Sequence, residues 1–295
     1  CPKREKAINL FNQLNIGDPM THTEFLLNSS DGMKLFAQKW LPQGEVRASI
    51  NLVHGLGEHS GRYFHVANAL NQAGFALTAF DLRGHGKTGG VRGHIPSYDA
   101  AAEDINHLVE ESTALFPGIP QFLYGHSLGG ALVLFTSLFH NPKINGVIAS
   151  SPGLDPGSVP PAKLFAVRLL SKLAPSFTMT NGLDVSNLSH DKAVIDAYQR
   201  DPLVHPMVSC RLGYELITNG RRIADYQGIF PYPLLLLQGA EDHLVNPTAN
   251  QRFASQLSGS TTSKVFTDGY HELHNDPWND KVISFMIDWI KSFLN

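Results

Sequence analysis

Ser127 stands between two glycines in the stretch LYGHSLGG, which runs from Leu123 to Gly130. The residues before it, QFLY, predict a strand, and the residues after it, GALVLFTSLFH, predict a helix. A serine on a sharp turn between a strand and a helix is typical of a catalytic nucleophile, because the turn exposes the hydroxyl and leaves room only for small neighbours. A Gly-x-Ser-x-Gly pattern also arises by chance in a chain with 26 glycines, but the strand and helix around this one favour a nucleophile.

A serine hydroxyl is a weak nucleophile at neutral pH and needs a general base, which a carboxylate must orient. Two acids, Glu241 and Asp242, follow the apolar run PLLLLQ, and two histidines, His271 and His274, follow the run KVF. Serine, acid and histidine therefore occur in the chain order that is typical of a nucleophile on a strand-to-helix turn. The residue types alone leave open which acid and which histidine are used.

An enzyme that transfers an acyl group must stabilise an oxyanion with two backbone N–H groups. One comes from the residue after the nucleophile and the other from the loop after an earlier strand. These are here the N–H groups of Leu128 and Leu56, the second of which lies in the stretch LVHGLGEHSGRY. The helix that begins after Ser127 also directs the positive end of its dipole at a developing oxyanion.

The elements that must position these residues are predicted from short apolar runs that alternate with helix-length amphipathic segments. This alternation predicts a parallel sheet with crossover helices. Before it, the pair Asp31-Gly32 between TEFLLN and MKLFAQKW predicts a hairpin of two antiparallel strands. The strands expected after the hairpin are 48–54, 75–80, 121–125, 146–150, 232–239 and 264–266, and the expected helices are 61–73, 97–116, 128–140, 247–257 and 280–293.

The alternation of strands and helices stops between Ser151 and Gln227. The pattern of this segment is mostly helical, and prolines interrupt it repeatedly. We therefore expect a core formed by residues 1–150 and 228–295, and a helical cap formed by residues 151–227.

One segment of the expected cap, PPAKLFAVRLLSKLAP, predicts an amphipathic helix. Its apolar arc carries Phe165, Leu169 and Leu173 together with Ala166 and Leu170, and the opposite arc carries Arg168, Ser171 and Lys172. The apolar arc either packs against the core or faces a membrane surface, and the pattern leaves both open.

Composition excludes several classes of protein. The chain has 295 residues, 23 basic and 26 acidic side chains spread along it, and a formal net charge of −3, so no basic stripe is available for nucleic acid. No apolar run reaches the roughly 18 residues of a membrane span. We expect a cytoplasmic or peripheral membrane protein, with a lipid anchor on Cys1 as a minor alternative. Cys1 and Cys210 allow at most one disulfide, and nothing in the sequence defines an oligomeric state.

Motifs for nucleotides and metals fail on their spacing. The stretch GHGKTGG has Asp81 where a phosphate-binding loop needs its first glycine, and GLGEHSG has Ser60 where a dinucleotide-binding motif needs its third. The stretch HELH places its two histidines three residues apart, which does not fit the zinc motif HExxH. We therefore expect neither a cofactor nor a metal.

The sequence resembles the α/β-hydrolase superfamily, and within it the monoacylglycerol lipases. The blocks HGLGEHSGRY, DLRGHGKTGG, GHSLGG, AYQRDPLV, LLLQGAED and GYHELHND look like blocks of that family, in the family's order. The resemblance implies the α/β-hydrolase fold, in which helices flank a mostly parallel central sheet and a helical cap is inserted. It also implies that Asp242 and His271 are the partners of Ser127, a choice that the residue types left open.

For the substrate, the resemblance implies a monoacylglycerol that is split into glycerol and a fatty acid through an acyl-Ser127 intermediate. It also implies that the amphipathic helix borders the acyl entrance and touches membranes. The residues placed as in the glycerol head-group site of those lipases are Glu58, Arg62, His126, Tyr198 and His274. A structural ion pair between Glu58 and Arg62, four positions apart, is an equally good explanation of those two residues. A lysophospholipase or a broad carboxylesterase remains the alternative function.

Overall fold

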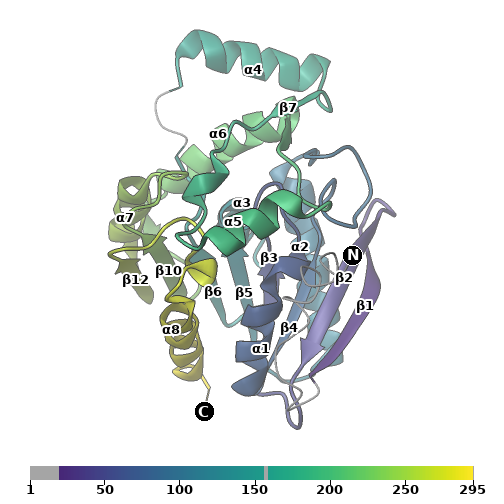
Figure 1. Cartoon of the computed structure of the whole chain (residues 1–295), viewed down its shortest axis with the longest axis vertical. Coiled ribbons are helices and arrows are strands. Elements are labelled where there is room, and N and C mark those ends of the chain that lie inside the picture. Colours follow the sequence, from purple (N-terminus) through teal and green to yellow (C-terminus); the bar gives the residue numbers. More distant parts are fainter. Residues whose placement is uncertain (1–19, 156–158, 295) are drawn as a thin grey trace, which may run out of the picture.

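An eight-stranded sheet in the order β1-β2-β4-β3-β5-β6-β10-β12 runs through the centre of the molecule (Figure 1). We describe it from a computed structural model, in which residues 20–155 and 159–294 are placed. Cys1, the expected anchor position, lies outside the described residues. The strands are β1 Thr21–Asn28, β2 Lys34–Leu41, β3 Ala48–Val53, β4 Phe75–Phe80, β5 Gln121–His126, β6 Gly146–Ser150, β10 Leu234–Gly239 and β12 Thr261–Phe266.

The expected hairpin forms the antiparallel edge of this sheet. Strands β1 and β2 pair along their whole lengths, from Thr21 opposite Leu41 to Asn28 opposite Lys34. Gly32 adopts φ +83 in the turn between them, a conformation that glycine adopts without strain. The predicted hairpin is therefore confirmed.

The remaining strands from β3 to β12 run parallel to one another. Strands β3, β4, β5, β6 and β10 are buried along their whole lengths. Burial on both faces explains why these strands appear in the sequence as continuous apolar runs rather than as alternating patterns.

Helices cover both faces of the sheet, and each face has its own apolar core. On one face, α1 Phe64–Gln72, which follows the 3-10 turn η1 Ser60–Tyr63, and α8 Asn279–Lys291 enclose a core that includes Leu70 and Met286. On the other face, α2 Tyr98–Leu115, α3 Leu128–Phe139 and α7 Pro247–Gln256 enclose a second core. The predicted α/β class, a mostly parallel sheet between two helical layers, is confirmed.

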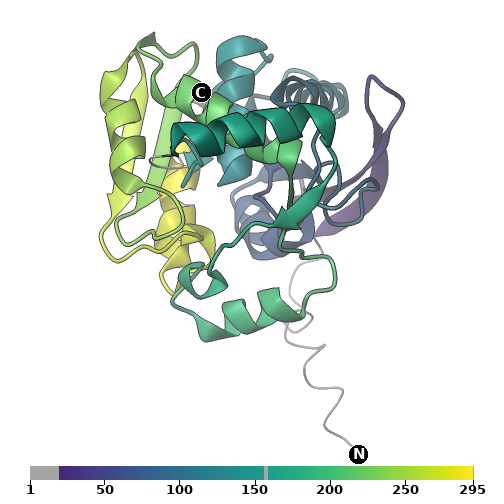
Figure 2. The same ribbon diagram turned by 90° about the horizontal axis from the view of Figure 1, so that it is seen from above.

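The segment between β6 and β10 lies above one end of the sheet (Figures 1 and 2). It contains α4 Pro161–Leu173, β7 Thr178–Thr180, the 3-10 turn η2 Val185–Asn187, α5 Lys192–Arg200, β8 Met207–Ser209 and α6 Cys210–Ala224. Strands β7 and β8 pair in antiparallel fashion, a two-stranded element that a mostly helical pattern did not predict. Helix α6 places Leu212 and Ile223 in the same core as α2 and α3, so the end of the expected cap also belongs to the packing of the main domain.

Three short elements complete the chain. Strands β9 Gly228–Ile229 and β11 Leu257–Ser258 form a second small sheet, and the 3-10 turn η3 Leu273–Asn275 follows β12.

The loops after β3, β5, β10 and β12 all leave the same end of the sheet, because these strands are parallel. Leu56, Ser127, Asp242 and His271 lie in those four loops, one in each.

Candidate active site

Ser127 occupies the turn between β5 and α3, with φ 55 and ψ −115. A positive φ is uncommon for a residue with a Cβ atom and persists only where the surroundings hold it. The N–H of Ser127 donates to the carbonyl of Ser150 at 3.0 Å, and its carbonyl accepts from the N–H groups of Ala131 at 3.0 Å and Gly153 at 3.1 Å. The neighbouring strand and the first turn of α3 thus fix the serine in this conformation.

The glycines around Ser127 are required by close approach of the backbone. A Cβ atom on Gly125 would lie 2.2 Å from the carbonyl oxygen of Gly129, and one on Gly129 would lie 2.0 Å from the carbonyl oxygen of Val53. Gly130 packs against Pro152, where a Cβ atom would lie 3.0 Å from Cα. Any side chain at Gly125 or Gly129 would therefore push the serine turn away from β3 or from α3.

His271 and Asp242 lie together, as the resemblance to the monoacylglycerol lipases implied. Nδ1 of His271 is 2.8 Å from Oδ2 of Asp242, and both side chains are buried. Oδ1 of Asp242 accepts from the N–H groups of Leu244 at 2.9 Å and Val245 at 3.0 Å, and Oδ2 accepts from Nε2 of Gln238 at 3.1 Å. The carboxylate is thus held by four donors if the imidazole Nδ1 carries a proton.

The two groups shift each other's pKa. Burial opposes ionisation of Asp242, but the adjacent His271 and the hydrogen bonds to the carboxylate outweigh it and lower the pKa of Asp242. Burial likewise disfavours the imidazolium of His271, but the Asp242 carboxylate outweighs burial and raises the pKa of His271 above its ordinary value. A histidine stabilised in its charged form is suited to receive a proton during a reaction.

The competing acid and histidine are placed differently. Glu241 is exposed, and its Oε2 lies 3.9 Å from Nε2 of His190. His274 is buried with its ring stacked on Tyr63, 4.7 Å between centroids, and burial together with nearby positive groups lowers its pKa well below the ordinary value. Neither residue forms the acid–imidazole pair that the chemistry requires.

A cavity of about 290 Å³ joins the candidate catalytic residues to the cap. Ser127 and His271 line it, and so do Leu56 and Leu128, the two predicted oxyanion donors. The rest of its wall is mostly apolar and comes from both the cap and the main domain: Gly153, Asp155, Asn181, Leu183, Val208, Gly213, Leu216, Ile217, Leu244 and Val245. Such a wall fits a hydrocarbon chain better than a polar ligand.

None of the five predicted head-group residues lines this cavity. Arg62 forms ion pairs with Glu58 at 2.5 Å and with Glu272 at 2.6 Å, so the structural ion pair that the spacing suggested is present. Tyr198 lies over the guanidinium, 4.7 Å from its ring centroid to Cζ. Glu272 gave no signal in the sequence beyond its place next to His271.

His126 lies between the candidate base and His274 in a chain of ring contacts. The ring of His126 is 4.8 Å from the ring of His271 and 4.8 Å from the ring of His274. Burial, with a smaller contribution from His271, lowers the pKa of His126 to about 3. Of these three histidines only His271 has a raised pKa, which favours it as the candidate base.

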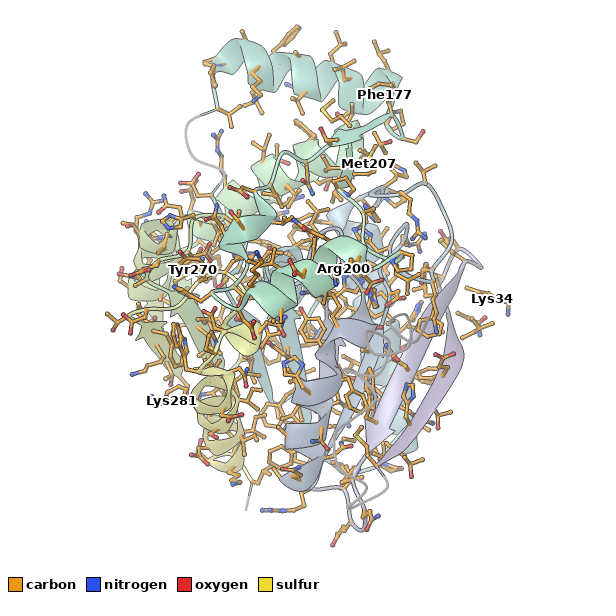
Figure 3. The ribbon with its side chains drawn as sticks, viewed as in Figure 1. Lys34, Phe177, Arg200, Met207, Tyr270 and Lys281 are labelled. Carbon is orange, nitrogen blue, oxygen red and sulfur yellow. The ribbon has the colours of Figure 1, made fainter. Side chains whose placement is uncertain are left out.

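Helix α4 is the outermost element of the cap (Figures 1 and 2). Its predicted apolar arc faces away from the core, with exposed fractions of 68% for Phe165, 46% for Leu169 and 74% for Leu173. Phe177, just beyond the helix, lies at the same outer end and is also exposed (Figure 3). Packing of this arc against the core, one of the two alternatives, is therefore wrong. Within residues 20–155 and 159–294, every helix is too short or too polar to cross a bilayer.

The sheet order, the serine turn after β5 and the Asp–His pair at the neighbouring strand ends define an α/β hydrolase. The chain belongs to the family described as serine aminopeptidase, S33, whose model matches residues 44–278.

Individual relatives span most of the chain. A monoacylglycerol lipase of Mycolicibacterium smegmatis is 30% identical over 277 residues, 93% of this chain and 99% of the relative. The crystal structure of the Paleococcus ferrophilus monoacylglycerol lipase has a TM-score of 0.78 and 33% identity, and covers 94% of this chain and 100% of its own. An uncharacterised abhydrolase domain-containing protein of Dictyostelium discoideum is 35% identical over 278 residues. This alignment covers 92% of this chain but only 29% of that protein. The resemblance to the monoacylglycerol lipases is confirmed.

Proposed function

We propose that the chain is a serine ester hydrolase that cleaves monoacylglycerol into glycerol and a free fatty acid. The observation that carries this proposal is the mostly apolar cavity that ends at Ser127 and His271, with Asp242 bonded to the imidazole at 2.8 Å. The relatives that carry the name monoacylglycerol lipase support the choice of substrate.

The reaction begins when Oγ of Ser127 attacks the ester carbonyl carbon and Nε2 of His271 takes the hydroxyl proton. The carbonyl oxygen becomes an oxyanion that accepts from the N–H groups of Leu56 and Leu128, at the positive end of the α3 dipole. The C–O bond to glycerol then breaks, and the glycerol oxygen leaves with the proton from His271. Water, deprotonated by His271, next attacks the acyl-Ser127 ester and releases the fatty acid with the serine hydroxyl restored.

Asp242 has two tasks in this scheme. It accepts from Nδ1–H of His271, which leaves Nε2 unprotonated and able to accept the serine proton, and its negative charge stabilises the imidazolium. The backbone N–H groups of Leu244 and Val245 hold the carboxylate in the orientation that makes this possible.

The cap, taken as residues 151–227, covers the cavity and carries the outward-facing arc of α4. We assign this arc to contact with a membrane surface, because Phe165, Leu169 and Leu173 are exposed on one helix that also carries Lys163, Arg168 and Lys172 and no acidic residue. A lipid substrate would then pass from the bilayer surface that α4 contacts to the cavity at Ser127.

The head-group role of Glu58, Arg62, His126, Tyr198 and His274 stays a prediction. Arg62 bonds to both Glu58 and Glu272, so the polar groups of Arg62 and Glu58 are already paired.

The test of the function uses Ser127→Ala, with Ser137→Ala as the matched control. Ser137 is buried on α3, where its hydroxyl donates to the carbonyl of Val133, and it does not line the cavity. We expect Ser127→Ala to lose ester hydrolysis and labelling by a fluorophosphonate probe, and Ser137→Ala to keep both. Retained activity in Ser127→Ala, or a probe adduct on another serine, would overturn the assignment.

Comparison of substrates tests the specificity. We expect kcat/KM to be higher for a monoacylglycerol than for the diacylglycerol, the triacylglycerol and the lysophospholipid with the same acyl chain. A faster rate on the lysophospholipid would favour the alternative function. Faster hydrolysis of an aminoacyl amide would favour the peptidase activity that the family description names.

A further inference from the structure

Arg62 joins two buried carboxylates that come from two different loops of the site. Its Nη1 lies 2.5 Å from Oε2 of Glu58 and 2.6 Å from Oε1 of Glu272, and its Nη2 lies 2.7 Å from Oε2 of Glu272. Glu58 lies in the loop after β3, and Glu272 lies in the loop after β12. The exposed fractions of the three side chains are 10% for Arg62, 3% for Glu58 and 2% for Glu272, so water hardly competes for these bonds.

Each of the two glutamates is also connected to a group that the reaction uses, Glu58 by a hydrogen bond and Glu272 as the neighbour of His271 in the chain. Oε1 of Glu58 accepts from the N–H of Gly55 at 2.6 Å and from the hydroxyl of Tyr63 at 2.8 Å. Gly55 precedes Leu56 and lies against the nucleophile, since a Cβ atom on Gly55 would be 3.3 Å from Cβ of Ser127. A continuous set of short hydrogen bonds thus begins at the loop after β3 that carries Gly55 and Leu56, which we call the oxyanion loop.

The same set of hydrogen bonds ends at Glu272, next to the proposed base His271. Glu272 is the residue directly after His271, and its Oε2 also accepts from Nδ2 of Asn275 at 2.7 Å. Its backbone N–H donates to the carbonyl of Leu188 in the cap at 2.8 Å. The position of His271 along its loop therefore depends on where Glu272 is held.

We propose that Arg62 is a positioning residue, which sets the distance between the loop of Leu56 and the loop of His271 through Glu58 and Glu272. The proposal rests on the proposed function, because it takes Leu56 as an oxyanion donor and His271 as the base. A guanidinium suits this task because its planar set of donors binds Glu272 with two nitrogens and Glu58 with one of them at the same time. The compact ammonium of lysine has no such planar fork.

The charges support this role. Although burial opposes ionisation, Arg62 lowers the pKa of Glu272 to about 2, so this carboxylate is ionised at neutral pH. Burial and the negative charge of Glu272 raise the pKa of Glu58, although Arg62 acts in the opposite direction. Without the guanidinium, two buried carboxyl groups would face each other with no cation between them, and one of them would have to take a proton or move away. Either change moves one of the two loops.

The experiment compares Arg62→Lys with the wild type on two esters of one acyl chain, the monoacylglycerol and the p-nitrophenyl ester. A positioning residue acts on the reacting groups, so kcat falls by the same factor on both esters, on the order of 10- to 100-fold, with KM almost unchanged. A head-group residue acts on glycerol, so KM rises on the monoacylglycerol alone. The second pattern, or unchanged kcat on both esters, would overturn the proposal.

Arg83 provides a matched control for the loss of a buried guanidinium. Its Nε lies 2.6 Å from Oδ2 of Asp104 and its Nη1 lies 2.5 Å from Oδ2 of Asp31, and none of the three residues lines the cavity. We expect Arg83→Lys to lower Tm while kcat stays within about twofold of the wild type on both esters. If Arg83→Lys loses as much kcat as Arg62→Lys, the effect comes from general destabilisation and the positioning role is wrong.

The pH profile gives a readout that a purely structural role would not move. Because the negative charge of Glu272 is one of the groups that raise the pKa of His271, Glu272→Gln shifts the acid limb of kcat/KM to lower pH. An unchanged limb in Glu272→Gln contradicts the connection from Arg62 to the base. Failure of the function itself is recognised separately: if Ser127→Ala still hydrolyses both esters, Leu56 and His271 lose their roles and the positioning role fails with them.

Discussion

Replacement of Asp242 by asparagine should damage catalysis mainly by changing the tautomer of His271. Oδ1 of Asp242 accepts from two backbone N–H groups, those of Leu244 and Val245, so the amide oxygen of an asparagine would keep that position. The amide NH₂ would then point at Nδ1 of His271, which would have to accept a hydrogen bond. The proton of the neutral imidazole would move to Nε2, where it blocks transfer from the serine.

The expected loss in kcat for Asp242→Asn is on the order of 10⁴, the value for the corresponding change in the serine-protease triad. At 1.36 kcal/mol per tenfold change this corresponds to roughly 5 kcal/mol of transition-state stabilisation. The control is Glu241→Gln, which changes the exposed neighbour and leaves the bond between Asp242 and His271 in place. We expect the control to keep kcat within about threefold.

The pH dependence is a second readout of the same change. His271 must be neutral to accept a proton, so kcat/KM rises with pH through the pKa of His271, which lies above its ordinary value of 6.5 in the wild type. In Asp242→Asn the charge that raises this pKa is gone while burial, which lowers it, remains. The acid limb measured on a short-chain p-nitrophenyl ester therefore moves to lower pH. A limb that stays in place, or a larger loss in Glu241→Gln, would refute the assignment of the carboxylate.

Three further variants, the first with a matched control, test the backbone, the ion pair of Glu272 and the cap. Gly129→Ala should prevent folding, because its Cβ would meet the carbonyl of Val53, whereas Gly89→Ala, with open space around it, should keep the wild-type Tm. The pKa of Glu272 is lowered from 4.5 to about 2, so its ion pair contributes stability above about pH 4.5 that is lost as pH falls toward 2. In urea titrations, the free energy of unfolding of the wild type should therefore exceed that of Glu272→Gln by about 3 kcal/mol at pH 7 and by much less near pH 2. Replacement of the three exposed apolar residues of α4 by serine should weaken binding to liposomes in a flotation assay, without loss of Tm or of short-ester hydrolysis. These residues are Phe165, Leu169 and Leu173. Unfolding of this variant would contradict their exposed placement.

The nucleophile turn could be predicted from the sequence because its constraints are local. Gly125 and Gly129 are required by carbonyl oxygens that approach within 2.0–2.2 Å of a Cβ position, and both lie two residues from Ser127. The parallel sheet could be predicted for a similar reason, since burial on both faces leaves continuous apolar runs at regular intervals.

The choice of carboxylate depended on geometry that no spacing reveals. Glu241 and Asp242 follow the same strand, but only Asp242 points inward, where it meets His271 and the N–H groups of Leu244 and Val245. The contact between Arg62 and Glu272 is harder still to predict, because 210 positions separate the two residues in the chain. It exists because the loops after β3 and β12 leave the same end of the sheet.

The direction in which the apolar arc of α4 faces also could not be predicted from the sequence pattern. Helical periodicity placed Phe165, Leu169 and Leu173 on one arc, but an arc packed against the core and an arc facing a membrane have the same periodicity. Their exposed fractions, between 46% and 74%, come from the way α4 packs on α6 at the outer end of the cap (Figure 1).

The cap touches the oxyanion loop at a place far along the chain from α4. The N–H of His205 donates to the carbonyl of Gly57 at 2.9 Å, and Oδ2 of Asp201 lies 2.9 Å from Nε2 of His59. Gly57 adopts φ +79, and a Cβ atom there would lie 2.4 Å from the carbonyl oxygen of His205, so only glycine lets the cap chain come this close to Leu56. The exposed apolar arc and the segment bonded to the oxyanion loop are thus different elements of the cap. The proposed contact of α4 with a lipid surface would therefore leave the bond between His205 and Gly57 in place.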